Sequence, residues 1–317
     1  KVIEAILKHI DELANIKKET EITIEVNPTL FEQQKLKIFR ELGINRVSIG
    51  IQALNDSDLK ILGREHSVEK AISTIELVQK IFDNYSFDLI YGRHGQTLDS
   101  WQAELHQALK YIKHHISLYQ LTIEPNTLFD LQYKVGKFKK PSQELEAQMF
   151  EINQEILETH GIHQYEISNF ATHGKESIHN LAYWNYNEYL GIGPGAHSRA
   201  IIDKELFAIS IEEKPPLWLK KLENNSSTIK EKYKLSNTQI AYEYILMNLR
   251  KTDGINIADF YVKFNKDIYK YLDKKTLNSF QIAGWLQYTT KRISITKDGR
   301  IFLDKIIKDI IKTNANC

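Results

Sequence analysis

The feature that most constrains this chain is a regular alternation of short apolar runs with longer amphipathic stretches. Between Glu21 and Glu124, four apolar runs are separated by three stretches with helical periodicity. Such a strand–helix order predicts a parallel sheet covered by helices. The expected strands are Ile22–Val26, Arg46–Ile51, Phe87–Tyr91 and Ile116–Leu121, and the expected helices are Phe31–Leu42, Val68–Phe82 and Leu98–Ile112.

The carboxyl ends of these strands carry polar residues and glycines. Asn27-Pro28 follows the first strand, Gly50 to Gln52 closes the second, and Tyr91-Gly92 closes the third. In parallel α/β units, ligands bind beyond the carboxyl ends of the strands. The pattern therefore predicts a binding site on one rim of the sheet.

Composition limits the class of protein. The 317 residues are 42% hydrophobic and 26% charged, with a formal net charge of +1. These values are ordinary for a globular protein with a sizeable core, and they favour neither a nucleic-acid partner nor a membrane partner. No apolar run approaches the roughly 20 residues that span a bilayer, and no signal-peptide pattern opens the chain. We therefore expect a cytoplasmic protein without a transmembrane segment.

The strand–helix alternation stops near Pro125. A long helix is expected over Gln143–Thr159, with Ser142 as its N-cap, and a strand is expected over His163–Phe170. The polar stretch from Leu206 to Lys234 is rich in proline, asparagine and serine, which is typical of a connector. We therefore expect four regions: a partial barrel at 1–124, an extension at 125–205, a connector at 206–235 and a C-terminal module at 236–317.

The C-terminal module has the element order of a winged helix. Three helices precede a short hairpin and a last helix, at Gln239–Leu249, Ile257–Phe264, Lys275–Ala283, Leu286–Tyr288 with Ile293–Thr296, and Gly299–Ile311. Winged helices can bind DNA, but the lysines here are interleaved with aspartate and glutamate. We therefore favour packing or partner contact, and nucleic-acid binding is the alternative.

Six motifs occur in a fixed order along the chain. They are Glu25-Val26-Asn27-Pro28, Val47-Ser48-Ile49-Gly50-Ile51-Gln52, Gly63-Arg64-Glu65-His66, Asp88-Leu89-Ile90-Tyr91-Gly92, His179-Asn180-Leu181-Ala182-Tyr183-Trp184 and Gly191-Ile192-Gly193-Pro194-Gly195-Ala196-His197-Ser198. Together they resemble the radical S-adenosylmethionine (SAM) proteins of the oxygen-independent coproporphyrinogen oxidase group, and most closely its HemW-like heme chaperones. The resemblance implies an α/β fold of the TIM-barrel type with a winged-helix tail.

The resemblance also implies SAM and a [4Fe-4S] cluster as cofactors. The family holds its cluster on a Cys-x3-Cys-x2-Cys loop, whereas this chain has one cysteine, Cys317. A cluster needs several thiolates, so this chain alone cannot build one, and no metal ligands are expected in it. The chain opens on an amphipathic helical pattern that, in the family, follows the cysteine loop. We therefore expect an N-terminally shortened family member with an incomplete barrel.

Four residues match SAM contacts of the family. Glu25 would accept the ribose hydroxyls, as acidic residues do in dinucleotide folds; a solvated strand end is the alternative. Gln52 offers an amide to polar atoms of SAM, or else caps the helix over 56–62. Arg64 suits the SAM carboxylate, or else is an exposed helix-end residue. Asp88 lies in an apolar strand, where an unpaired carboxylate is costly, so it must face a partner.

One loop departs from the family pattern. Arg93-His94 stands where the family has a Leu-Pro pair, before Gly95-Gln96-Thr97. Losing the proline predicts a looser loop, and Arg93 adds a cation where an apolar turn is expected. Together with the missing cysteines, this departure favours relaxed selection or a non-functional remnant.

The run His179-Asn180-x-x-Tyr183-Trp184 is associated with heme in HemW-like proteins. Imidazole is a common axial ligand of heme iron, and aromatic rings pack against a porphyrin face. The alternative is a structural turn in which His179 bonds the backbone and Trp184 fills the core. The remaining histidines lack metal-ligand spacing and are expected at the surface: His66, His94, His106, His114, His115, His163 and His173.

The resemblance implies a heme chaperone that carries heme as cargo to an acceptor protein. Two alternatives stay open. One is a radical SAM oxidase of porphyrin biosynthesis, which requires a cluster that this chain cannot build. The other is a truncated remnant without function. The sequence identifies neither the acceptor nor the oligomeric state.

Overall fold

The structure is a computed structural model that describes residues 1–312, apart from the side chain of Phe31. The chain divides into two compact units, Lys1–Glu176 and a second that begins at Ser177. This division falls inside the region 125–205 that we expected to form one extension. Cys317 lies outside the described residues.

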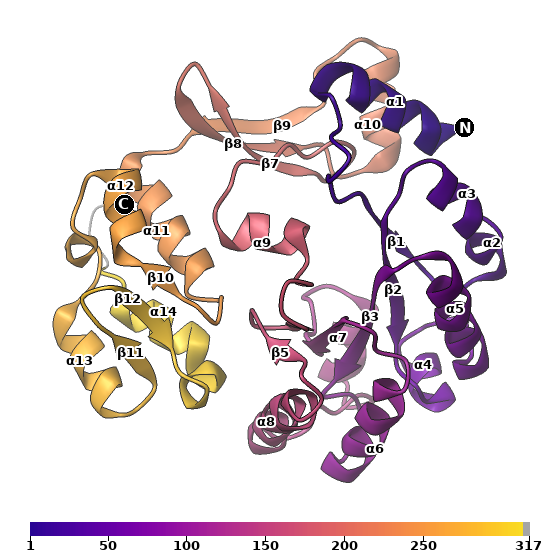
Figure 1. The fold of residues 1–317 in the computed structure, drawn as a ribbon, viewed down its shortest axis with the longest axis horizontal. Helices are drawn as coiled ribbons and strands as arrows, with labels where there is room; N and C mark the ends of the chain where they lie inside the picture. Colours follow the sequence, from indigo (N-terminus) through magenta and orange to yellow (C-terminus); the bar gives the residue numbers. More distant parts are fainter. Residues whose placement is uncertain (313–317) are drawn as a thin grey trace. The chain divides into compact units, whose positions relative to one another are not determined.

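The first unit is built on a six-stranded sheet with the order β1-β2-β3-β4-β6-β5 (Figure 1). Strands β1 (Thr23–Val26), β2 (Arg46–Gln52), β3 (Asn84–Tyr91) and β4 (His115–Gln120) pair in parallel, as the sequence predicts. Strands β5 (His163–Gln164) and β6 (Asn169–Ala171) extend the sheet in antiparallel fashion. The single strand expected over 163–170 is therefore wrong. The chain turns back there, and the Gln164 side chain donates to the Ile167 carbonyl at 2.9 Å.

The helices of the first unit begin mostly at capping side chains. Thr97 and Ser142 accept hydrogen bonds from the third residue of their helices, which satisfies backbone donors that lack partners. The cap expected at Ser142 is thus confirmed. The helix expected over 31–42 is split in two. The unit's helices are α1 (Val2–Ala14), α2 (Leu30–Gln33), α3 (Leu36–Glu41), α4 (Asp56–Ile61), α5 (Val68–Ile81), α6 (Leu98–Leu109), α7 (Leu128–Lys134) and α8 (Gln143–Glu158).

The core of the first unit lies between the sheet and helices α5 and α6. Alternate residues of the parallel strands point toward these helices, and they are apolar and almost fully buried: Val47, Ile49, Ile51, Tyr85, Phe87, Leu89, Ile116 and Leu118. Trp101 of α6 is also fully buried, and its ring lies 5.7 Å from that of Tyr91. The residues between these apolar positions point to the opposite face of the sheet.

The second unit starts with α9 (Ile178–Trp184) and a three-stranded antiparallel sheet of β7 (His197–Ile202), β8 (Glu205–Ile211) and β9 (Ile229–Lys234). The connector expected over 206–235 is therefore wrong, because β8 pairs with both neighbours along its length. Helix α10 (Pro215–Glu223) lies between β8 and β9 in sequence. The prolines begin this helix, a position where a missing backbone N–H costs nothing.

The C-terminal module has the expected element order. Helices α11 (Asn237–Asn248), α12 (Ile257–Phe264), α13 (Lys274–Ile282) and α14 (Leu303–Ile310) accompany a sheet of β10 (Ile255–Asn256), β12 (Arg292–Ile295) and β11 (Leu286–Tyr288). The last expected helix begins as a 3-10 turn, Asp298–Phe302, and another such turn covers Ile268–Lys270. Among the described residues, no helix has the length and apolar character needed to cross a membrane.

Candidate functional site

The face of the first sheet that is turned away from α5 and α6 is polar. Arg46 and Ser86 are buried there, and an Arg46 guanidinium nitrogen donates to the Ser86 hydroxyl at 3.0 Å. The Ser86 hydroxyl lies 2.9 Å from that of Ser48 on the neighbouring strand. Further along the sheet, Ser117 of β4 stands in register with Asp88 and Asn169. A row of hydrogen-bonding side chains thus runs across the strands on this face of the sheet.

Asp88 sits in this row. Its carboxylate accepts a hydrogen bond from the Ser48 hydroxyl at 3.3 Å. Burial raises the pKa of Asp88 to about 6, a nearby Glu25 adds to the rise, and hydrogen bonds from Ser117 and Ser48 oppose it. The Ser48 hydroxyl thus gives Asp88 a partner within the sheet, and its expected contact with SAM stays a prediction. A carboxyl group with such a pKa can change its charge near neutral pH.

The rim of the sheet is formed by the ends of β1 and β2. Glu25 is exposed there and is paired in register with Ser48. At Gly50 an added Cβ would lie 3.1 Å from the Gln52 amide nitrogen and 3.4 Å from the Asn27 amide oxygen. A larger residue at position 50 would therefore press on the end of the Gln52 side chain. The rim offers an exposed carboxylate and two amide side chains around a bare stretch of backbone.

Gln52 closes β2 in an unusual conformation. Its φ of 72° is left-handed, and the register of β2 against β3 shifts between Ile49 and Gln52. The alternative in which Gln52 caps the following helix is wrong, because the side chain of Asn55 accepts the capping hydrogen bonds from Ser57 and Asp58. Bulges of this kind redirect side chains at the rims of sheets.

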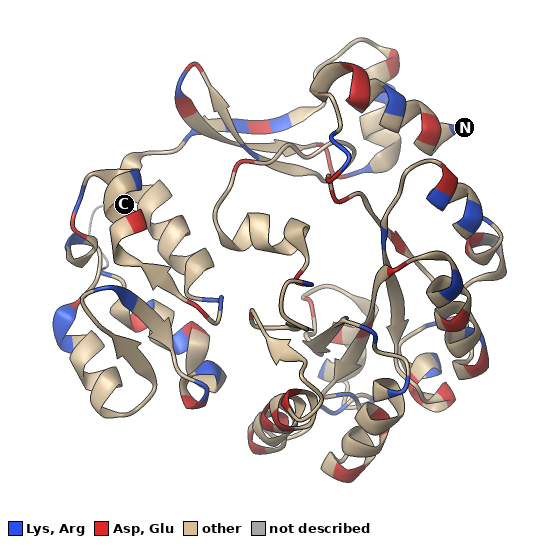
Figure 2. Ribbon diagram, in the orientation of Figure 1, with Lys and Arg blue, Asp and Glu red and all other residues tan. Residues whose placement is uncertain are grey.

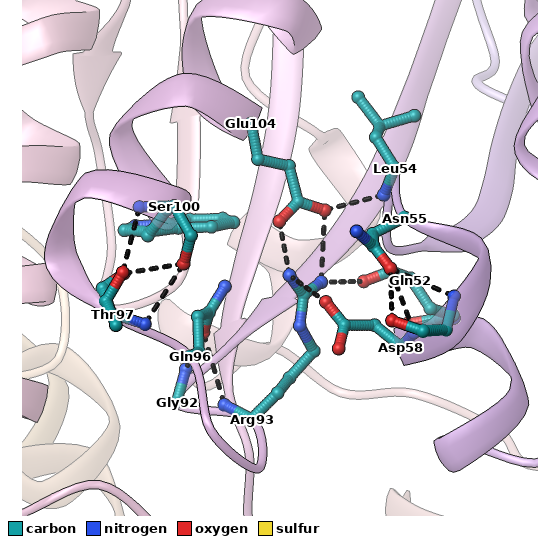
Figure 3. Close-up of polar contacts among 12 residues, drawn as sticks. Gln52, Leu54, Asn55, Asp58, Gly92, Arg93, Gln96, Thr97, Ser100 and Glu104 are labelled. Atoms are coloured by element: carbon teal, nitrogen blue, oxygen red, sulfur yellow. Dashed lines mark hydrogen bonds and ion pairs between the residues drawn. The ribbon is translucent and has the colours of Figure 1, made fainter.

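Arg93 is buried, with 2% of its surface exposed, beneath this rim. Its guanidinium forms an ion pair with Glu104 of α6, in which the Nη1–Oε1 distance is 3.0 Å, and its Nη2 lies 3.0 Å from Asp58 of α4 (Figure 3). It also donates to the Gln52 carbonyl at 3.4 Å. The looser loop expected from the missing proline is therefore wrong. Three buried or part-buried partners hold Arg93 and tie the β3–α6 loop to α4 and β2.

Glu104 and Gln96 complete the same network. One Glu104 oxygen accepts from the Leu54 backbone N–H at 2.5 Å, and the Gln96 side chain accepts from the N–H groups of Gly92 and Arg93 at 2.8 and 3.2 Å (Figure 3). The backbone around the ends of β2 and β3 is therefore fixed by side chains from two helices and one loop. A fully hydrogen-bonded network of this kind holds the backbone at the ends of β2 and β3 in one conformation.

Arg64 and His66 follow α4 on the same side of the sheet. Arg64 is half-buried, and its backbone N–H bonds the Leu59 carbonyl at 2.8 Å. His66 is also half-buried, with Nε2 3.1 Å from the Ile51 carbonyl. Burial lowers the pKa of His66. The expected surface position of His66 is therefore wrong, because its ring packs under the end of β2.

His115 was also expected at the surface but is fully buried. Its Nε2 lies 2.9 Å from the Tyr165 hydroxyl, and burial lowers the pKa of His115 to about 3. Glu166 is 1% exposed and bonds Asn169 and the Ser168 N–H. Sequence reasoning missed these residues. The available signal was the alternation of polar residues along each strand, as in Arg46-x-Ser48, Ser86-x-Asp88 and His115-x-Ser117-x-Tyr119.

A second candidate region lies on α9 in the second unit. His179 and Tyr183 are one helical turn apart, and their rings meet edge to face with centroids 4.8 Å apart. Tyr183 meets Tyr189 in the same manner at 4.5 Å. His179 is exposed, whereas Asn180, Tyr183 and Trp184 are half-buried. The segment is a helix without fully buried residues, so Trp184 does not fill the core, and the alternative in which His179 bonds the backbone stays open.

A cavity of about 240 Å³ lies beside α9. Tyr183, Tyr186 and Tyr189 line it together with Met247 of α11. The wall also includes Arg199 and Glu243, whose bidentate ion pair has N–O distances of 2.9 and 3.0 Å. The Tyr186 hydroxyl donates to the same carboxylate at 2.6 Å. Tyr183 of the motif therefore lines a cavity that is rich in tyrosine and has the hydrogen-bonded Arg199–Glu243 pair in its wall.

The charges of the C-terminal module are mixed. Acidic and basic residues are mixed on α12 and α14, whereas α13 and the β11–β12 hairpin carry basic residues only (Figure 2). Several of them pair with each other, such as Arg250 with Asp304 at 3.0 Å and Lys305 with Asp309 at 2.7 Å. Nucleic-acid binding needs a concentrated basic surface. Ion pairs therefore neutralise part of the module's basic charge.

The described residues do not fit an iron–sulfur cluster. They contain no cysteine, since Cys317 lies beyond them, and they hold no group of three or more His, Cys, Asp or Glu side chains that could bind a metal. At the rim of the first sheet, the exposed Glu25 carboxylate and the Gln52 amide have the chemistry to bond a ligand with hydroxyl and amino groups, as SAM has.

Comparison with known families covers both units. Residues 2–108 match the model of the radical SAM superfamily, and residues 235–302 match that of the HemN C-terminal domain. The solved structure of coproporphyrinogen III oxidase (HemN) from Escherichia coli superposes with a TM-score of 0.80 at 20% identity, over 96% of this chain and 73% of that one. The fold is thus that of a radical SAM domain with a HemN-type C-terminal domain.

Two relatives narrow this class. The mitochondrial radical S-adenosyl methionine domain-containing protein 1 of Danio rerio is 33% identical over 98% of this chain and 71% of its own length. The heme chaperone HemW of Bacillus subtilis is 32% identical over 90% of this chain and 75% of its own length. The chain therefore belongs to the HemW-like family of radical SAM proteins. Membership of this superfamily implies SAM and a [4Fe-4S] cluster as cofactors.

Proposed function

We propose that this protein binds heme at α9 and passes it to an acceptor protein. The observation that carries the proposal is the geometry of His179, an exposed imidazole braced edge to face by Tyr183 beside an aromatic cavity. A braced imidazole is suited to ligate iron, and the neighbouring rings of Tyr183 and Trp184 are suited to cover a porphyrin face. The relatives described as heme chaperones support the same role.

An exposed ligand suits a carrier better than an enzyme. His179 lies at the surface, so heme bound there remains accessible to a second protein. Asn180, whose backbone N–H bonds the Ser177 cap at 3.3 Å, belongs to the same helical turn. The short helix α9 fixes the relative positions of all four motif residues. Release to an acceptor then requires exchange of one imidazole rather than opening of a core.

For the first unit we propose SAM binding at the rim. Glu25 would accept the ribose hydroxyls, Gln52 would bond polar atoms of the ligand, and Arg64 would pair with its carboxylate. Asp88, with a raised pKa, would hold or release a proton beside the ligand's amino group. SAM, when bound, supplies an electrophilic sulfonium centre. The proposal for this rim is SAM binding alone, because the described residues do not fit a cluster.

The proposed compartment is the cytoplasm. The similarity to bacterial heme chaperones supports this compartment. The mitochondrion is the alternative, because other relatives are mitochondrial proteins. Cell fractionation with a tagged full-length gene product separates the two, because a mitochondrial protein co-sediments with that organelle.

Heme titration followed by transfer tests the proposed function. We expect saturable binding of one heme, seen as a shifted Soret band, and loss of that band when excess apomyoglobin is added. Apomyoglobin serves as a generic acceptor, because it takes up heme that another protein releases. Non-saturable binding that matches bovine serum albumin treated in parallel would refute the proposal.

A further inference from the structure

A second, larger cavity of about 630 Å³ lies within the second unit. It is bordered by the β7–β8 hairpin, the end of β9, the start of α11 and the end of α12. Its volume falls within the range of about 300–1,000 Å³ that small-molecule sites occupy. It shares Tyr186, Asn187 and Arg199 with the smaller cavity beside α9. The two spaces are therefore neighbours on either side of one wall.

The lining combines an apolar surface with an excess of positive charge. Ile201, Leu206, Leu235, Ile240 and Phe264 supply the apolar part. The charged part has four cations, Arg199, Lys204, Lys234 and Lys263, and two carboxylates, Glu188 and Glu205. A mostly apolar pocket with a few placed polar or charged groups is typical of small-molecule sites, and the excess of cations here favours an amphipathic anion.

Within residues 1–312, two of the four cations of the lining are held in ion pairs, and two are not. Arg199 is held by Glu243, and Lys234 is held by Glu205 at 2.5 Å. Lys204 and Lys263 are exposed at the cavity and form no ion pair among the described residues. Glu188 is the remaining carboxylate of the lining. The start of α11 also lines the cavity and carries no acidic residue in its first turn, which adds to the preference for an anion.

The hairpin turn that carries Lys204 is strained. Asp203 and Lys204 have φ values of 51° and 67°, and they connect the facing pair Ile202 and Glu205. A two-residue turn with both φ values positive is built most easily from Asn-Gly or Gly-Gly. A lysine in this conformation costs free energy that glycine would not. Strain of this kind points to a use for the Lys204 side chain.

We propose that this cavity binds an amphipathic dicarboxylate, a flat apolar body whose carboxylates pair with Lys204 and Lys263. A porphyrin with its two propionates is the member of this class that a heme carrier would meet, so the porphyrin assignment rests on the proposed function. The apolar ring would pack against Ile201, Ile240 and Phe264. The cavity shares Tyr186, Asn187 and Arg199 with the space that Tyr183 of α9 lines.

Metal-free protoporphyrin IX is the direct probe, because it has the propionates but no iron for His179 to ligate. Its affinity is measured by fluorescence for the wild-type protein, for Lys204→Gly/Lys263→Gln, and for a control with two exposed lysines far from the cavity lining, Lys220→Gln/Lys308→Gln. We expect at least about tenfold weaker binding for the first double variant, since two charge-assisted contacts are lost, and an unchanged affinity for the control. Lys204→Gly alone should fold at least as stably as wild type, because glycine relieves the strained turn.

Three further arms identify the ligand class. The dimethyl ester of protoporphyrin should bind wild-type protein about as weakly as the free acid binds the lysine double variant. Ile240→Phe, which fills the cavity, should weaken the porphyrin acid as well. Palmitate, an amphipathic monocarboxylate, should compete poorly.

An affinity of the folded lysine double variant within twofold of wild type would overturn the inference, and lysine-dependent binding of palmitate in place of porphyrin would overturn the porphyrin assignment. The His179→Ala variant separates this inference from the proposed function. It should lose the heme Soret band yet keep metal-free porphyrin affinity, so each claim can fail alone.

Discussion

Replacing Arg93 by leucine tests the buried network under the sheet rim. Arg93 and Glu104 are 2% and 8% exposed. The variant would leave the Glu104 carboxylate with a hydrogen bond from the Leu54 N–H but without the Arg93 guanidinium. Removing one partner of a buried ion pair costs about 3–5 kcal/mol, whereas the part-exposed contact with Asp58 adds about 1 kcal/mol or less. We therefore expect Arg93→Leu to lower the free energy of unfolding of the first unit by about 3–5 kcal/mol.

Urea unfolding followed by tryptophan fluorescence measures this change, because Trp101 lies on α6 near Glu104. The double variant Arg93→Leu/Glu104→Leu should be more stable than the sum of the two single changes predicts, by about 2 kcal/mol, since no lone charge stays buried. Arg292→Leu is the matched control, because its pair with Asp253 is exposed, and it should cost less than about 1 kcal/mol. If Arg93→Leu changes stability no more than this control, the network does not brace the rim.

Two further predictions concern the first unit. Because burial raises the folded-state pKa of Asp88 from 3.8 to about 6, the contribution of its protonated form to stability is fully present below about pH 4 and is lost as the pH rises through 6. Asp88→Asn should therefore become more stable relative to wild type by up to about 3 kcal/mol between pH 4 and pH 7.5; a pH-independent difference in urea unfolding would contradict the burial argument. Glu25→Gln should weaken SAM binding in calorimetry without changing the unfolding midpoint, because Glu25 is exposed, whereas equal SAM affinities would remove Glu25 from the site.

Sequence patterns located the sheet well because hydrophobic alternation dominates local structure there. The runs around Val47 to Ile51 and Phe87 to Leu89 are buried against α5 and α6 as their composition requires. Strand β9 was missed for the opposite reason. All six of its residues are exposed, so no face of the strand carries an apolar signal, and backbone pairing with β8 alone defines it.

The network around Arg93 was not predictable from the loop in which Arg93 lies. Its partners Asp58 and Glu104 are distant in sequence, and only the fold brings them together. One signal was present in α6, where Glu104 falls on the same face as Trp101, Leu105 and Ala108, all buried. A carboxylate on a buried helical face requires a cation nearby. The replacement of the family's proline by His94 was therefore a weaker guide to this loop than the charge of Arg93 beside it.

The most direct test of the heme-carrier account compares His179→Ala with His173→Ala in the heme-loaded protein. His179 is braced by Tyr183 on α9, whereas His173 is an exposed residue outside the motif. We predict that His179→Ala abolishes or strongly shifts the Soret band and that His173→Ala leaves it unchanged. Identical spectra for the wild-type protein and both variants would contradict the assignment of α9 as the heme site.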